Sequence, residues 1–134
     1  MKNLTDIIDG KGNSSANPCI KLFELLFKSI TDAPVTHLIQ DDRSYAKHMA
    51  LGSYYDTLPG LLDTLFETYK AIYPVEELQI PACSKIANCE AYFTNLYKSI
   101  ENARASIKES FLISQLDDIQ EEVAQLLYKL KFVK

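Results

Sequence analysis

The chain has 134 residues, a net charge of −4 at pH 7 and a hydrophobic content of 47%, with four glycines and five prolines. Such a composition indicates one globular domain with a real core, and it excludes a disordered or low-complexity chain. Charges interrupt every apolar run and no basic face or tail stands out, so the sequence excludes a membrane-spanning segment and disfavours nucleic-acid binding.

Residues 1–16 are expected to form a flexible leader, because Gly10, Gly12 and the polar residues after them are typical of turns and linkers. The first residues lack the basic-then-apolar pattern of a secretory signal. The cysteines number three, an odd count, and include no C-x-x-C pair: Cys19, Cys83 and Cys89. We therefore expect a cytoplasmic protein with small, partly buried thiols, the alternative being a disulfide or a reactive thiol.

The first helix is predicted to begin at Pro18, where Asn17 can cap it and the missing N–H of proline costs nothing. Apolar residues then recur at steps of three and four as far as Ile30. Pro34 is expected to kink or restart the helix, with a second piece over residues 35–40 running in the same direction.

A long second helix is predicted from its cap Ser44 to about Tyr73, where Pro74 ends it. Its apolar stripe contains Tyr45, Met49, Leu51, Tyr55, Leu58, Leu62, Leu65, Phe66 and Tyr69. Pro59 is expected to bend this helix or to split it in two.

A loop is predicted over residues 74–84, followed by a third helix over 85–109 and a fourth over 114–130. Both helices carry apolar residues at alternating steps of three and four, the pattern of a bundle seam. Ser114, with Asp117 three residues on, resembles a capping box. The predicted fold is all-α: one domain over residues 17–134, built as an antiparallel four-helix bundle.

Two histidines and two acids form the candidate metal site. His37 lies near the end of the first helix and His48 one turn into the second, which also carries Asp63 and Glu67 on one face. Because Asp63 follows His48 by fifteen residues, about 22 Å of helix separates them. Only a second copy packed antiparallel could bring the acids to His48, which couples metal binding to a two-fold dimer. These ligands suit iron, manganese or zinc.

The stretch from His37 to His48, followed by Asp63 and Glu67, resembles the Dps branch of the ferritin-like superfamily. The resemblance implies a ferritin-like fold, with these four residues binding iron at a ferroxidase site across a dimer two-fold. It also implies shells of twelve subunits that store iron. Residues 44–56 and 114–123 look like a phage-encoded family of ferritin-like fold and unassigned function.

The sequence departs from the Dps pattern at three points. Gly52 stands where the pattern has an acid ligand one turn after His48, and Leu38 stands in place of a tryptophan. The spacing between the two histidines is also one residue short. One acid fewer would weaken iron binding, so we expect a reduced or altered metal site.

Three functions remain open from the sequence. The first is a Dps-type helical protein, phage-encoded, that forms a dimer or larger oligomer with an altered inter-subunit metal site. The second is an active ferroxidase and iron store, and the third is a metal-free viral interaction or sequestration module that holds a host protein or a small ligand. In the third case His37 and His48 are hydrogen-bonded residues at helix ends, and Asp63 and Glu67 form a solvated acidic face.

Overall fold

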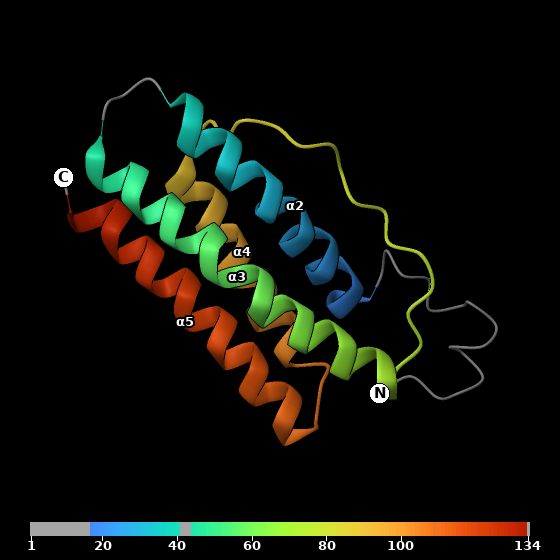
Figure 1. The fold of residues 1–134 in the computed structure, drawn as a ribbon. Helices are drawn as coiled ribbons and strands as arrows, with labels where there is room; N and C mark the ends of the chain where they lie inside the picture. Colours follow the sequence, from blue (N-terminus) through green and yellow to red (C-terminus); the bar gives the residue numbers. More distant parts are fainter. Residues whose placement is uncertain (1–16, 41–43, 134) are drawn as a thin grey trace.

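The computed structural model describes residues 17–40 and 44–133 (Figure 1). Within these ranges the chain forms helices and no strand. The helices are α2 (Pro18–Ile39), α3 (Tyr45–Ile72), α4 (Cys89–Arg104) and α5 (Ser110–Phe132). The prediction of an all-α, four-helix fold is confirmed, whereas the expected leader over residues 1–16 lies outside the described residues.

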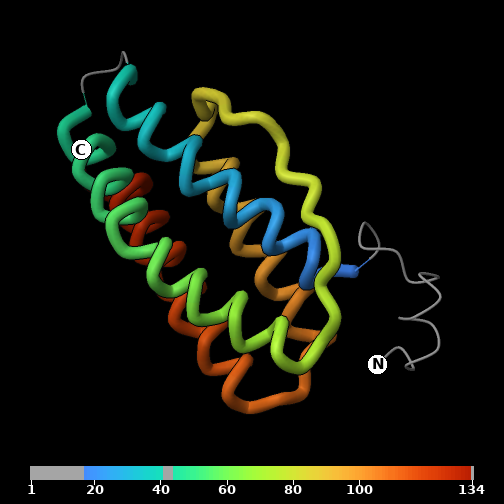
Figure 2. Tube along the Cα trace, turned by 45° about the vertical axis from the view of Figure 1, so that its right-hand side comes forward, coloured from blue at the N-terminus to red at the C-terminus, as the bar shows by residue number. Residues whose placement is uncertain are grey.

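A long crossover between α3 and α4 sets the topology of the bundle. Residues 73–88 run back along α2, so that α4 begins at the same end of the bundle as α3 (Figure 2). Helix α2 packs against α3 and α4, and α5 packs against the same two helices, which leaves α3 and α4 on one diagonal. Every pair of neighbouring helices is therefore antiparallel (Figure 1).

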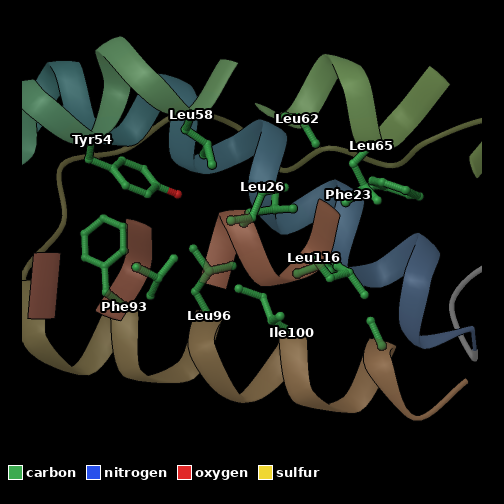
Figure 3. Close-up of a cluster of buried hydrophobic side chains, with 14 of the residues drawn as sticks. Phe23, Leu26, Tyr54, Leu58, Leu62, Leu65, Phe93, Leu96, Ile100 and Leu116 are labelled. Atoms are coloured by element: carbon green, nitrogen blue, oxygen red, sulfur yellow. The ribbon is translucent and has the colours of Figure 1, made fainter. Parts of the chain in front are cut away.

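One apolar core lies between the four helices. The predicted seams are buried, with Phe93, Leu96 and Ile100 on α4 and Leu116 on α5 lining the core (Figure 3). Ile119 and Val123 of α5 are buried as well. Tyr54 and Phe93 meet edge to face across the α3–α4 diagonal, with ring centroids 4.9 Å apart. Among the described helices, none has the length and apolar character required to cross a membrane.

Local hydrogen bonds fix the helix starts that the sequence predicts. The Asn17 side chain accepts from the Cys19 N–H at 2.8 Å, and Ser44 accepts from the Lys47 N–H at 3.1 Å. Both predicted caps are confirmed. The three cysteines are thiols, with Cys19 and Cys89 buried and Cys83 exposed.

The prolines do not interrupt their helices. Helix α2 continues through Pro34 and α3 through Pro59, so the predicted restart at Pro34 and the predicted split at Pro59 are wrong. Proline in a helix interior costs about 3 kcal/mol. The buried residues Ala33 and Thr36 on either side of Pro34 hold α2 in the bundle, because packing outweighs that local cost.

The last two helices have different bounds from the prediction. Helix α4 begins after its cap Asn88 and ends at Arg104, so it is shorter at both ends than predicted. Helix α5 begins at Ser110, and Ser114 lies inside it rather than capping it. The predicted third helix is too long because Ile86 and Ile107, which flank α4, are also buried in the core and continue its apolar pattern.

Side chains of α2 hold the irregular crossover in place. Glu24 accepts from the Gln79 N–H at 2.6 Å, and Asp32 accepts from the Ser84 N–H at 2.8 Å. Thr36 accepts from the Ile86 N–H at 2.8 Å. These three acceptors lie along one side of α2. They bind backbone N–H groups of the crossover that have no partner in a helix or strand.

A tyrosine–carboxylate contact ties the end of α3 to the start of α5. The Tyr73 hydroxyl donates to the Glu109 carboxylate, whose oxygens lie 2.7 and 2.9 Å away. This hydrogen bond lowers the pKa of Glu109 from its usual 4.5. Burial, followed by the contact with Glu109, raises the pKa of Tyr73 to about 12.

We predict that Tyr73→Phe returns the pKa of Glu109 to its ordinary range, as measured by NMR titration of the side-chain carboxyl carbon. A lowered pKa in the folded state stabilises the protein above the unfolded value of 4.5, and this stability is lost as pH falls through the lowered value. The free energy of unfolding of the variant should therefore fall less than that of the wild type as the pH is lowered through this range. A Glu109 titration unchanged in the variant would contradict the assignment.

Candidate functional site

The α2–α3 hairpin brings the two histidines into direct contact. His37 lies in the last turn of α2 and His48 in the first turns of α3. Their rings stack, with centroids 3.7 Å apart and planes inclined by 20°. Both side chains are half-buried, so the pair lies at the surface of the bundle.

Each ring is fixed by the backbone of the other residue. The Nδ1 atom of His37 lies 2.6 Å from the His48 carbonyl oxygen, and the Nδ1 atom of His48 lies 3.2 Å from the His37 carbonyl oxygen. A carbonyl oxygen only accepts, so each Nδ1 carries the hydrogen. In a neutral ring, Nε2 is then the atom with a lone pair for a metal ion, and a carbonyl partner at the other nitrogen is common for metal-binding histidines. The donor chemistry of the pair therefore fits a transition metal.

Aromatic side chains and one glycine surround the pair. Tyr55 meets His37 edge to face at 5.3 Å, and Tyr45 stacks on His48 at 6.4 Å. Gly52 lies beneath His37, where a Cβ atom would stand 3.1 Å from the ring atom Cε1. The imidazoles thus lie in a packed layer rather than as freely rotating surface groups.

The two acids of the candidate site do not approach the histidines within one copy. Asp63 and Glu67 are exposed on α3, which is a continuous helix, so Asp63 stays about 22 Å from His48 along it. Among the residues that the structure describes, no three His, Cys, Asp or Glu side chains gather closely enough to hold a metal ion. One copy therefore offers two imidazoles at one end of α3 and two carboxylates further along it.

A buried carboxylate that sequence reasoning missed lies on the other side of α2. Asp32 is 0% exposed; it forms an ion pair with Lys28 and accepts from the Tyr92 hydroxyl at 2.9 Å and from the Ser84 N–H at 2.8 Å. Burial, then the contacts with Asp32, raise the pKa of Tyr92. Because donors surround this carboxylate, it anchors the crossover and offers no open position to a ligand. The signal in the sequence that could have indicated this site was the position of Asp32 among the buried positions of the first helix.

Comparison with known proteins gives one family. Residues 37–130 match the model of a family described as a family of unknown function (DUF5856). No curated protein and no solved structure matches the chain. The matched segment begins at His37 and includes His48, Asp63 and Glu67.

Proposed function

We propose that this chain, which belongs to the DUF5856 family, is a ferritin-like helical protein that holds a divalent transition metal between two copies. The observation that carries the proposal is the stacked pair of His37 and His48. Each ring has its Nδ1 engaged by a backbone carbonyl, which leaves Nε2 as the metal donor. A pair at the protein surface is also accessible to ligands from a second molecule.

The topology supports a ferritin-like identity. Ferritin-like bundles differ from simple up-down bundles in having one long crossover connection, so that the second and third helices of the bundle are parallel. The crossover over residues 73–88 has this property, since α3 and α4 begin at the same end of the bundle (Figure 2). The resemblance to a phage-encoded family makes host cytoplasm the proposed location.

The outward face of α3 is the proposed dimer surface. Five of its exposed residues follow intervals close to whole helical turns and therefore form one stripe: Tyr45, Met49, Asp56, Asp63 and Glu67. Two copies of α3 packed antiparallel would place the histidine end of one beside the acidic end of the other. His37 and His48 of one copy and Asp63 and Glu67 of the second would then hold one metal ion at each of two equivalent sites.

Metal binding, rather than iron oxidation, is the proposed activity. A bound divalent ion would bridge the two copies and add its binding free energy to the dimer. The active ferroxidase with iron storage is the second hypothesis, and the same purified protein tests it. Ferrous oxidation no faster than in buffer, with a particle mass of a dimer rather than of a shell, would remove it.

We predict that His48→Ala abolishes the metal content of the purified protein, measured by mass spectrometry of the metal together with light scattering of the particle. Asp63→Asn combined with Glu67→Gln should have the same effect. Asp118→Asn combined with Glu122→Gln is the matched control, because it changes an acid pair of the same spacing on α5. Wild-type protein that binds no zinc, cobalt or iron would overturn the proposal.

Mixed dimers test whether the site is shared between copies. A heterodimer of His48→Ala with the Asp63→Asn/Glu67→Gln chain contains one site with all four ligands. Its other site lacks His48 and both carboxylates. We expect metal in these heterodimers and none in either homodimer. Metal that stays absent from the heterodimer, while wild type binds it, would place the ligands within one chain.

A metal-free interaction module is the third candidate function, and exposed apolar side chains favour it. Tyr45 is 73% exposed and Met49 51% exposed on the outward face of α3. A face of this kind can bind a host protein or a second copy without a metal. In that case His48→Ala would leave the association unchanged, whereas Tyr45→Ser and Met49→Ser would weaken it.

A further inference from the structure

Gly52 has no side chain at the point where α3 passes under the His37 ring. An ideal Cβ at this position would lie 3.1 Å from Cε1, 3.5 Å from Nδ1 and 3.8 Å from Nε2 of His37. The first distance is shorter than ordinary van der Waals contact between carbon atoms. A side chain at position 52 would therefore require the His37 ring to shift by a few tenths of an ångström.

The His37 ring has little freedom to move away from an added side chain. The ring is stacked on His48 and meets the ring of Tyr55 edge to face. Its Nδ1 is hydrogen-bonded to the His48 carbonyl oxygen at 2.6 Å. Gly52 lies inside a regular helix, where glycine costs about 0.5–1 kcal/mol relative to alanine. The helix itself gains nothing from this glycine, so the approach of the ring accounts for it.

Position 52 is also a place on α3 from which a third ligand could approach the pair. A residue four positions after His48 lies one turn away on the same side of the helix. A carboxylate there would meet the space that the His37 ring occupies. An acid at position 52 would therefore press on the His37 ring and disturb its stacking on His48.

From this packing we infer that Gly52 is a positioning residue that sets the metal preference of the proposed site. It leaves room for the second imidazole and supplies no carboxylate, so the histidine end of α3 contributes two nitrogen donors to each site. A second imidazole in place of a third carboxylate shifts the donor set toward nitrogen, which favours zinc and nickel over manganese and magnesium. The inference rests on the proposed function and names its metal class as zinc-like ions.

The test compares two glycine-to-alanine changes in the same helix. Gly60 has nothing within 4 Å of its ideal Cβ, so Gly60→Ala adds the same methyl group without a contact. We expect Gly52→Ala to weaken Zn²⁺ and Co²⁺ binding at least tenfold, the usual scale for a residue that orients a metal ligand. Gly60→Ala should bind both ions as the wild type does. Titration calorimetry gives the affinities, and the visible spectrum of bound Co²⁺ reports the donor set.

Gly52→Asp tests the preference itself. This substitution should displace His37 and supply an oxygen donor, so the ratio of Zn²⁺ to Mn²⁺ affinity should fall at least tenfold from the wild-type value. His37→Ala in the wild-type background should lower Zn²⁺ affinity as Gly52→Ala does, because both remove the same donor. A wild-type Zn²⁺ affinity in Gly52→Ala, or an unchanged ratio in Gly52→Asp, would overturn the inference and leave the proposed function standing.

A metal-free measurement separates the two claims. In the metal-free wild type, NMR should show a contact between the Gly52 α-hydrogens and the Hε1 hydrogen of His37. Gly52→Ala should shift the His37 ring resonances, and Gly60→Ala should not. If the wild type binds no Zn²⁺ or Co²⁺, the proposed function and the metal preference both fail, whereas the ring shifts would still show that Gly52 positions His37.

Discussion

Replacing Asp32 with alanine is expected to destabilise the protein by about 3–5 kcal/mol, the cost of removing one partner from a buried ion pair. The carboxylate is fully buried and accepts from the Ser84 N–H and the Tyr92 hydroxyl in addition to its contact with Lys28. Removing it takes the ion-pair partner from Lys28, whose side chain is 17% exposed, and leaves the Ser84 N–H and the Tyr92 hydroxyl without this acceptor. Since domains of this size are stable by only 5–15 kcal/mol, the loss is a large fraction of the total.

Urea unfolding followed by circular dichroism measures this effect as a change in free energy of unfolding. Asp32→Asn keeps a side-chain oxygen for one of the two donors, so it should cost less than Asp32→Ala. Asp118→Ala removes an exposed acid from α5 and should change stability by less than about 0.5 kcal/mol. A loss below about 1 kcal/mol for Asp32→Ala would contradict the role assigned to the carboxylate.

Replacing Phe93 with alanine is the second large change, with an expected loss of about 3–5 kcal/mol. The Phe93 ring is fully buried and meets Tyr54 edge to face across the bundle, so its removal leaves a cavity between α3 and α4 (Figure 3). The contacts with Tyr54 and Tyr92, both at 4.9 Å between centroids, add the edge-to-face attraction of aromatic rings.

Phe111→Ala is the matched control for Phe93→Ala. Phe111 also lies on a helix but is 49% exposed, so its truncation should cost about 0.5 kcal/mol or less. Thermal unfolding of both variants beside the wild type gives the comparison. Equal losses for the two would show that the Tyr54–Phe93 contact does not hold the centre of the core.

Helix existence and most of the core could be predicted because both depend on local patterns. The caps at Asn17 and Ser44 act on amide groups two and three residues away, and the apolar seams repeat along each helix. The start of α4 could not be predicted in the same way. Ile86 continues the apolar period, but its N–H is bonded to Thr36 of α2, fifty residues earlier in the chain.

In the candidate site, too, local features could be predicted from the sequence and features that depend on distant contacts could not. Placing the histidines at adjacent helix ends followed from sequence, but their stacking depends on two backbone carbonyls and on the bare surface of Gly52. The Asp32 cluster gave only a weak signal, because its partners Ser84 and Tyr92 come from distant parts of the chain. Joint metal binding by His48, Asp63 and Glu67 remains a prediction, since it needs a second molecule.

The crossover over residues 73–88 has a kinetic consequence. The α2–α3 and α4–α5 hairpins each form from neighbouring segments, which close quickly because the loops are short. The bonds from Ser84 and Tyr92 to Asp32 close across 52 and 60 residues, so they bring the hairpins together only after a large loss of chain entropy. We therefore expect docking of the two hairpins, with the crossover packing onto α2, to be the slow step of folding.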